Sequence, residues 1–507
     1  MSDAQSISLS LISHTNAGKT TLARTLLDED VGEVRDAAHV TSTADRHTLI
    51  ETAGGDELFL WDTPGFGDSA RLARRLAASA HPLRSLVASA WDRVCDRPFW
   101  STQQAVKNVR DEADVVLYLV NAAEKPQDAG YLEPEMRILE WIGKPVIALL
   151  NQTGPPRPAA DEAADVAVWR DALGTRAILR DVIALDAFAR CWIQEAALLD
   201  TVAPVLPQGK RHAFARLAAA WEARRKAQFD ASMAALAAPI VRAAADQEPV
   251  AEASLADSLR DVGRAVGLPL KGGGKTRGTA IEALAARLDA AIRASTDELI
   301  AIHRLEGRAA AVVTARLAAQ VVTRAPVDEK KAAIVGGFVS GALSGLVADL
   351  ASGGLTFGAG LVAGGVAGAV GGAGIARGVN LVRGTVGTTL RWSDEFIANL
   401  VPAAILRYLA VAHYGRGRGE WTEGEHPAFW RNVVMEAIAR RGGVRALAML
   451  RGSAGQADAG ADAWRRELAT LALGVLAGLY PDARMPQAFG GEVSPQPGAE
   501  APAPGDR

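Results

Sequence analysis

The chain has few cysteines and no excess of charge of either sign. Its 507 residues include two cysteines, Cys95 and Cys191, which are far apart and have no metal-ligand spacing around them. These features exclude a disulfide framework and a zinc site, and they fit a reducing compartment. With 55 basic and 58 acidic residues the net charge is -3. The charge balance gives no overall attraction for nucleic acid, so we expect no nucleic-acid partner.

We also expect no secretory signal at the N-terminus. No charged segment precedes an apolar one there, and the first apolar run already has the pattern of a strand. We therefore expect a cytoplasmic protein. A chain of 507 residues that is 49% hydrophobic is too long for a single core, so we expect two or three domains.

The stretch from residue 7 to residue 27 carries the strongest functional signal. Apolar residues alternate with serine over 7–12 and predict a buried strand, while leucines at helical spacing over 22–27 predict a helix. Gly18-Lys19-Thr20 lies between them. In a phosphate-binding loop of this form, backbone N–H groups point at the phosphates, Lys19 reaches the β- and γ-phosphates, and the Thr20 hydroxyl binds Mg²⁺.

The loop departs from the usual phosphate-loop pattern at one position. The pattern GxxxxGK[ST] has glycine where this chain has Ser13. A second Gly-Lys-Thr, at residues 274–276, has Pro269 at that position and no strand-like sequence before it, so we predict a flexible loop there. The loop residues predicted to contact nucleotide are Ser13, Asn16, Ala17, Gly18, Lys19, Thr20 and Thr21.

Two further segments supply what a GTP-hydrolysing switch requires. Thr43, with Thr41 as the alternative, is predicted to bind Mg²⁺ through its hydroxyl and the γ-phosphate through its N–H, although an ordinary polar loop would have a similar sequence. The apolar run 58–61 predicts a strand that ends in Asp62-Thr63-Pro64-Gly65. Asp62 would hold Mg²⁺ through water, and Gly65 lets its N–H approach the γ-phosphate.

With these motifs, residues 1–203 resemble an Era-like GTPase domain of the translation-factor-related P-loop class. The resemblance implies an α/β fold, a three-layer sandwich around a mostly parallel sheet, with GTP and GDP as ligands and Mg²⁺ as cofactor. Lys19 and Thr43 are the implied catalytic residues. Asn16 lies where potassium-stimulated members hold K⁺, which makes K⁺ a second implied cofactor; stabilisation of the loop by an Asn16 side-chain turn is the alternative.

Two positions differ from the family pattern and bear on activity and specificity. Phe66 follows Gly65, so no glutamine there orients water, and hydrolysis should be slow or rely on K⁺, another residue or a partner. The predicted strand 144–150 ends in Asn151-Gln152-Thr153-Gly154, where the family has NKxD. Gly154 thus replaces the carboxylate whose charge-assisted hydrogen bonds to guanine are worth ~1.5 to 3 kcal/mol.

Other groups near the base are therefore candidates for reading it. Residues 182–188 predict the last strand and its loop, so Asp186 or the Ala187 N–H is a candidate base contact. Asn151 and Gln152 are retained as nucleotide-binding residues. A nucleoside triphosphatase of relaxed base specificity is the alternative function.

The chain beyond residue 203 predicts an all-α region. Amphipathic spacing over 211–245, 255–268 and 279–322 predicts a helical domain at 204–331. The basic cluster Arg224-Arg225-Lys226 shares its predicted helix with acidic residues, which favours a solvated face. Residues 385–487 predict further helices in which tryptophans anchor packing, and residues 488–507 predict a disordered tail.

Residues 332–384 form a second distinctive segment. Over 332–376 the only charged residue is Asp349, and glycine recurs at every fourth position in two runs. The pattern predicts an apolar helical hairpin whose basic flanks place both ends in the cytoplasm, so we expect contact with the inner face of the cell membrane. A buried hairpin and a reversibly docking one are the alternatives.

The whole arrangement resembles a bacterial family in which an Era-like GTPase precedes a helical domain of unknown function. This resemblance implies a GTP-binding and GTP-hydrolysing switch that controls the helical domain. A membrane-inserting or membrane-remodelling protein regulated by nucleotide is a third hypothesis, and the oligomeric state, including a homo-oligomer, is left open.

Overall fold

The computed structural model describes residues 4–29, 44–78, 96–154, 156–189, 191–250, 275–305, 379–384, 387–415, 427–451 and 457–489. The predicted switch residues Thr41 and Thr43 lie outside these ranges, as does the predicted hairpin at 332–376. The roles predicted for them therefore stay predictions from the sequence.

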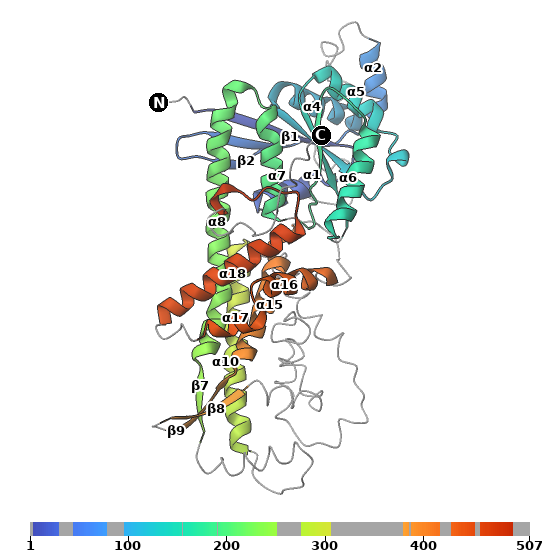
Figure 1. Ribbon diagram of the computed structural model, residues 1–507. Helices are drawn as coiled ribbons and strands as arrows, with labels where there is room; N and C mark the ends of the chain where they lie inside the picture. The colour runs from blue at the N-terminus through green and yellow to red at the C-terminus, as the bar shows by residue number, and fades with distance from the viewer. Residues whose placement is uncertain are drawn as a thin grey trace, which may run out of the picture.

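A six-stranded sheet forms the N-terminal domain (Figure 1). Its strands are β1 (Ser6–Ser13), β2 (Asp45–Glu51), β3 (Glu57–Asp62), β4 (Val115–Asn121), β5 (Val146–Asn151) and β6 (Leu179–Ala184). The order is β2-β3-β1-β4-β5-β6, and β2 pairs antiparallel with β3 while the other pairs are parallel. The α/β prediction for this domain is confirmed.

Helices cover both faces of this sheet. They are α1 (Lys19–Leu27), α2 (Ser69–Ala77), α4 (Arg97–Glu112), α5 (Leu132–Ile142), α6 (Ala159–Leu173) and α7 (Trp192–Val202). Side chains of α1 and α7 pack on one face, and those of α2, α4 and α5 on the other. Because both faces are covered, β4 and β5 are apolar along almost their whole length. Strand β1 ends at Ser13 and β3 ends at Asp62, so the phosphate loop and Asp62 lie at the carboxyl ends of neighbouring strands.

Strand β2 was not predicted from the sequence. Its sequence, DRHTLIE, does not alternate regularly between apolar and polar residues, and only Leu49 and Ile50 are buried. The strand exists because β3 supplies a partner at the sheet edge, with a register shift between Thr48 and Ile50. Pairing with a neighbour, rather than the local pattern, decides this element.

The remainder of the described chain is largely helical. Its helices are α8 (Gln208–Ala245), α10 (Lys275–Ile302), α15 (Asp394–Ala412), α16 (Ala428–Arg440), α17 (Gly443–Met449) and α18 (Ala457–Leu479). The 38-residue α8 begins beside the first sheet and continues between the other helices (Figure 1). One hydrophobic core runs from one face of the first sheet through α8 to α15 and α18. The two domains therefore pack as one body.

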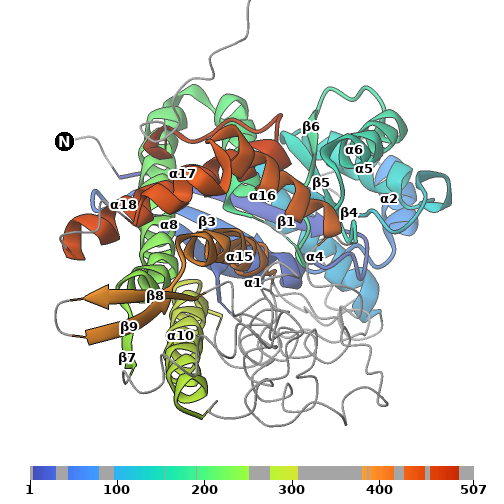
Figure 2. The ribbon, with the colours of Figure 1, turned by 60° about the horizontal axis from the view of Figure 1, so that its bottom comes forward.

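The all-α prediction for this region is wrong in one respect. Strands β7 (Gln247–Val250), β9 (Gly387–Trp392) and β8 (Val379–Gly384) form a small antiparallel sheet in that order (Figure 2). Residues 379–384, predicted as the end of the helical hairpin, are the strand β8. Strand β8 pairs with β9 along its length, with Leu381 opposite Leu390, so a partner strand rather than the local apolar pattern decides this element.

Three smaller expectations also change. Helix α10 ends at Ile302, well before the predicted limit at residue 322, and Arg304 has a positive φ of 53°. Lys275 and Thr276, predicted in a loop, begin α10. Phe489, placed in the predicted tail, is fully buried and stacks on Trp192 with ring centroids 4.3 Å apart.

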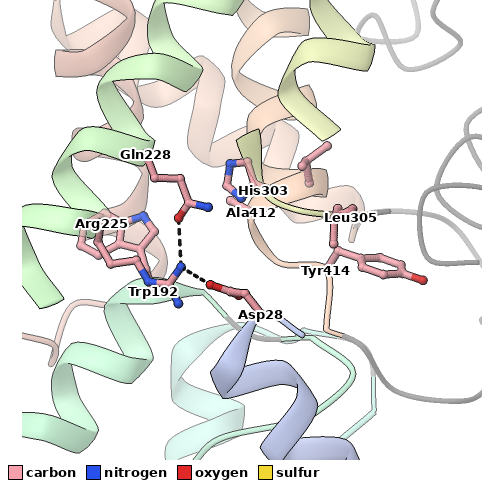
Figure 3. A pocket seen from close by; sticks show the side chains of 9 residues that line it. Asp28, Trp192, Arg225, Gln228, His303, Leu305, Ala412 and Tyr414 are labelled. Carbon is pink, nitrogen blue, oxygen red and sulfur yellow. Dashed lines mark hydrogen bonds and ion pairs between the residues drawn. The ribbon is translucent and has the colours of Figure 1, made fainter. Parts of the chain in front are cut away.

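One residue of the basic cluster of α8, Arg225, is buried, whereas Arg224 is exposed and Lys226 is partly exposed, so the predicted solvated face is wrong for Arg225. Arg225 is 4% exposed and bonds to Asp28 Oδ2 at 2.7 Å (Figure 3). It also bonds to Glu195 Oε2 at 2.7 Å. Asp28 caps the C-terminus of α1, and Glu195 lies on α7. Arg225 therefore joins α8 to two helices of the GTPase domain.

Helix α15 is long and apolar enough to cross a membrane by length and composition. However, 78% of its apolar window is buried inside the protein. It also carries the buried Arg407, whose guanidinium donates to the Ile292 carbonyl at 3.3 Å and to Thr296 Oγ1 at 3.2 Å. A helix in the core of a soluble protein can be equally long and apolar, so the composition of α15 is only weak evidence that it spans a membrane.

Candidate functional site

The phosphate loop has the backbone that anion binding requires. It joins β1 to α1, and both Asn16 and Gly18 adopt positive φ, 66° and 87°. A Cβ on Gly18 would lie 2.5 Å from Asn151 Nδ2, so only glycine fits this position. Successive N–H groups in such a turn form a concave site for phosphate at the start of α1.

Lys19 is held inside this loop. Its Nζ donates to Ser13 Oγ at 2.9 Å, and the Ser13 hydroxyl donates to the His14 carbonyl at 2.5 Å. Burial lowers the pKa of Lys19, while Asp62 and Glu135 act in the opposite direction. The serine that replaces the usual glycine thus gives the buried lysine a hydrogen-bond partner.

Asp62 lies opposite the first residues of α1. The Thr20 hydroxyl donates to Asp62 Oδ2 at 2.5 Å. Burial raises the pKa of Asp62, and the Thr20 bond and the charge of Lys19 lower it. Within the described part of the chain, the buried Asp62 Oδ1 accepts no hydrogen bond. A hydroxyl beside a carboxylate with an unused oxygen suits Mg²⁺, which takes oxygen ligands and retains waters.

The segment after Asp62 closes on the phosphate loop. Thr63 Oγ1 donates to the Leu11 carbonyl at 2.5 Å, and the Phe66 N–H donates to the Ser13 carbonyl at 2.8 Å. A Cβ on Gly65 would lie 3.0 Å from Lys19 Nζ and 3.2 Å from Thr15 Cα. The structure therefore brings Gly65 against the lysine that is predicted to contact the phosphates.

Asn151 connects the phosphate loop to the loop that follows β6. Its Nδ2 donates to the Ala17 carbonyl at 2.8 Å, and its Oδ1 accepts from the Ala187 N–H at 2.7 Å. Gln152 Nε2 donates to the Asn16 carbonyl at 3.4 Å. We call residues 185–189, which follow β6, the base loop.

Asp186, the candidate base contact, already accepts hydrogen bonds from neighbouring residues of the protein. It is 4% exposed, and its Oδ2 accepts from the Thr153 N–H at 2.6 Å and from Thr153 Oγ1 at 2.9 Å. Its Oδ1 accepts from the Phe188 N–H at 2.7 Å. Burial raises its pKa. Gly154, in contrast, has a φ of 84° and no atom within 4 Å of a Cβ placed on it.

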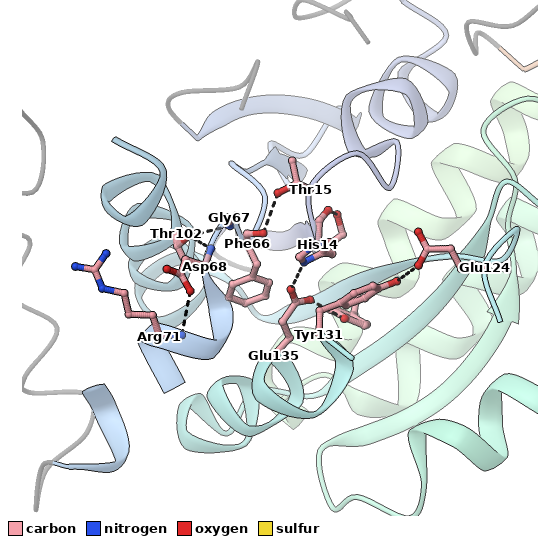
Figure 4. A network of polar contacts seen from close by, with 12 residues as sticks. His14, Thr15, Phe66, Gly67, Asp68, Arg71, Thr102, Glu124, Tyr131 and Glu135 are labelled. Carbon is pink, nitrogen blue, oxygen red and sulfur yellow. Dashed lines mark hydrogen bonds and ion pairs between the residues drawn. The ribbon is translucent and has the colours of Figure 1, made fainter. Parts of the chain in front are cut away.

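Sequence reasoning missed a polar network behind the phosphate loop (Figure 4). Glu135 on α5 is fully buried; its Oε1 bonds to His14 Nδ1 at 2.8 Å and its Oε2 accepts from the Tyr118 hydroxyl at 2.7 Å. The His14 ring stacks on Tyr131 with centroids 4.2 Å apart. Burial raises the pKa of Glu135. The available signal was a glutamate on the apolar face of the predicted helix, beside Met136 and Leu139.

Comparison with protein families defines the class of protein. The family described as 50S ribosome-binding GTPase matches residues 8–152. This match contains the phosphate loop, Asp62 to Gly65 and Asn151, so the N-terminal part is a GTP-binding GTPase domain of the kind that this family model describes, which implies GTP hydrolysis. A domain of unknown function, DUF3482, matches residues 170–446, more than half of the chain. The chain therefore belongs to the DUF3482 family, and the function of its C-terminal domain is unknown.

Solved structures similar to this chain include two of Era. Era from Aquifex aeolicus bound to GDP and aluminium fluoride is 19% identical, with 40% of this chain and 57% of that chain covered and a TM-score of 0.29. Era in complex with MgGDPNP and a segment of 16S ribosomal RNA is 18% identical, with 45% and 68% covered and a TM-score of 0.30. The chain thus spans 57% of the length of the first. A search of curated proteins found no match.

The position of Asp62 yields a testable expectation for the metal. Asp62→Asn keeps the shape of the side chain but removes the charge that would hold Mg²⁺ through water. The Mg²⁺ concentration for half-maximal GTP hydrolysis should rise on the order of 10- to 100-fold, the usual cost of losing an outer-sphere partner. Glu57→Gln, at the other end of β3, is the control and should leave the Mg²⁺ curve unchanged. An unaltered curve for Asp62→Asn would remove Asp62 from the metal site.

Proposed function

We propose that this protein is a GTP-hydrolysing switch whose nucleotide state alters its helical domain. One observation carries the proposal: at the ends of β1 and β3, Thr20 bonds to Asp62, and Gly65 lies against Lys19. In parallel sheets this edge is where ligands bind. The proposed cycle takes GTP to GDP, with Mg²⁺ required.

Each residue has a defined role in the proposal. Lys19 stabilises the negative charge that develops on the transferred phosphoryl group. Thr20 and Asp62 would hold Mg²⁺, which when bound neutralises phosphate charge. Gly65 brings its N–H toward the γ-phosphate. Thr43 as a second Mg²⁺ ligand and Asn16 as a support for K⁺ remain part of the proposal on the strength of the sequence.

The residue that follows Gly65 sets an expectation for the rate. Phe66 is fully buried, and its apolar ring has no group that orients a water molecule. We therefore propose slow intrinsic hydrolysis, with acceleration by K⁺ or by a partner. Measuring kcat for GTP in K⁺ and in Na⁺ buffers tests the K⁺ part of the proposal, because equal rates in the two salts would argue against it.

A nucleoside triphosphatase of relaxed base specificity is the second candidate function. The observation in its favour is that Gly154 has no carboxylate, while the Asp186 carboxylate already accepts hydrogen bonds from the loops around it. Titration calorimetry of GTP against ATP with Mg²⁺ distinguishes the candidates. A preference for GTP of roughly tenfold (~1.4 kcal/mol) or more supports the GTPase switch. Equal affinities support the relaxed enzyme, and absence of binding contradicts both.

Gly154→Asp should increase the preference for GTP. A carboxylate there can accept two hydrogen bonds from guanine, worth ~1.5 to 3 kcal/mol. The ~1 kcal/mol cost of a non-glycine residue at positive φ lowers the stability of the fold but cancels in the ratio of the two affinities. We expect the ratio of GTP to ATP affinity to rise roughly tenfold or more. Gly143→Asp is the matched control, because Gly143 also has a positive φ, 74°, and open space around its Cα. An equal ratio in both variants would contradict the prediction.

A further inference from the structure

We propose that Tyr414 and Gly415 of the helical domain are positioning residues of the nucleotide site. They lie directly after α15 and hold the base loop in place against the phosphate loop. The proposal rests on the proposed function and deepens it, because it names the contact through which the helical domain and the nucleotide influence each other.

The contact is made between two backbones. The Gly415 N–H donates to the Phe188 carbonyl at 3.1 Å, and Tyr414 forms an antiparallel bridge with Ala189. A Cβ on Gly415 would lie 2.0 Å from the Ala187 carbonyl oxygen and 2.7 Å from the Phe188 carbonyl carbon. Neither backbone can move aside as the end of a flexible side chain would. Any larger residue at 415 must therefore displace the base loop or the end of α15.

The same stretch of the base loop is bonded to the phosphate-binding elements. The Ala187 N–H donates to Asn151 Oδ1 at 2.7 Å, and Asn151 Nδ2 donates to the Ala17 carbonyl at 2.8 Å. From α1, the Thr25 hydroxyl donates to the Ala187 carbonyl at 2.9 Å. Gly415, the base loop, Asn151 and the phosphate loop thus form one continuous series of contacts.

The helical domain provides a rigid support for this contact. Helix α15 is almost entirely buried, and the Trp192 indole, just after the base loop, donates to the Tyr408 hydroxyl of α15 at 2.9 Å. Trp192 and Tyr414 also line a small cavity with Asp28 and Arg225, where α8 meets the end of α1 (Figure 3). The segment after α15 therefore contacts the base loop, and α15 itself contacts Trp192 just beyond that loop.

This arrangement predicts whether displacement of the base loop will change KM or kcat. The base takes no part in phosphoryl transfer, so a misplaced base loop weakens the ground state and the transition state equally. Such a loss raises KM and leaves kcat unchanged. By linkage, bound GTP must in turn stabilise the contact between the base loop and α15 to the same extent.

Gly415→Ala in the full-length chain tests the proposal. We expect the Kd and KM for GTP to rise roughly tenfold or more, with kcat unchanged and with unchanged affinity for inorganic tripolyphosphate, which lacks a base. Gly474→Ala, in α18 of the same domain, is the control because a Cβ there meets nothing within 4 Å. An unchanged Kd for GTP in a folded Gly415→Ala variant would overturn the proposal. Failure of the unaltered protein to bind GTP would overturn the proposed function instead.

A measurement without substitution covers the case in which Gly415→Ala does not fold. Hydrogen exchange of the unaltered protein is followed at residues 187–189 and 413–415 with and without GTP. Saturating GTP should slow exchange in both segments, by roughly tenfold or more if the coupling is of the usual size. Slower exchange at 187–189 alone, with no change at 413–415, would overturn the proposal.

Discussion

Lys19→Met is expected to reduce kcat for GTP hydrolysis by roughly 10² to 10³-fold, the cost of removing one fixed group that stabilises transition-state charge. The structure shows why no neighbour can replace it. Lys19 is 7% exposed, its Nζ is bonded to Ser13, and the loop backbone closes around it. Methionine fills a similar volume without the charge, so the loop should keep its form. Single-turnover hydrolysis at saturating GTP measures the effect.

The second Gly-Lys-Thr sequence provides the control for this experiment. Lys275→Met changes the second copy of the tripeptide, whose lysine begins α10. It should hydrolyse GTP at the unaltered rate. If Lys275→Met lost activity and Lys19→Met kept it, the nucleotide site would have been assigned to the wrong motif.

Arg225→Met is expected to lower the free energy of unfolding by about 3 to 5 kcal/mol, the usual cost of removing one partner from a buried ion pair. The guanidinium lies between Asp28 and Glu195, which are 17% and 4% exposed. Without Arg225, Glu195 would keep a buried charge and lose this cationic partner, although it would still accept a hydrogen bond from the Trp221 indole at 3.3 Å. Urea unfolding followed by tryptophan fluorescence measures the change.

The adjacent residue of α8 is a matched control. Lys226 pairs with Asp230 one turn along the helix, and both side chains reach solvent. Lys226→Met should therefore change the stability by no more than about 0.5 kcal/mol. A similar loss in both variants would mean that the contribution of Arg225 comes from general helix charge rather than from the buried pair.

The phosphate side of the site was predictable because its geometry is local. Lys19 and Thr20 follow a strand and begin a helix, and Asp62 ends another strand, so short segments already specify which groups face the phosphates. The parallel strands β1 and β3 then bring the two segments together. The long helix α8 was likewise readable from its amphipathic spacing, whereas the order of the strands in the sheet came from the structure alone.

The base side and the link between the domains were not predictable in this way. Asp186 had the correct position in the chain for a base contact, but the structure turns its carboxylate toward Thr153 and Phe188. Glu135 was overlooked because its partners His14 and Tyr118 lie on other elements. A side chain between two loops takes the direction that satisfies its hydrogen bonds, and those partners are known only once the loops are packed.

The sequence by itself determined the class of the protein and the place of the phosphate-loop motif, since both depend on short motifs at strand ends. Only the tertiary structure decided that Arg225 is buried rather than solvated, because its partner Asp28 lies 197 residues away in the chain. The tertiary structure also decided that Gly415 meets the base loop. Local patterns specify helices and turns, whereas contacts between distant segments follow from how those elements pack around a shared core.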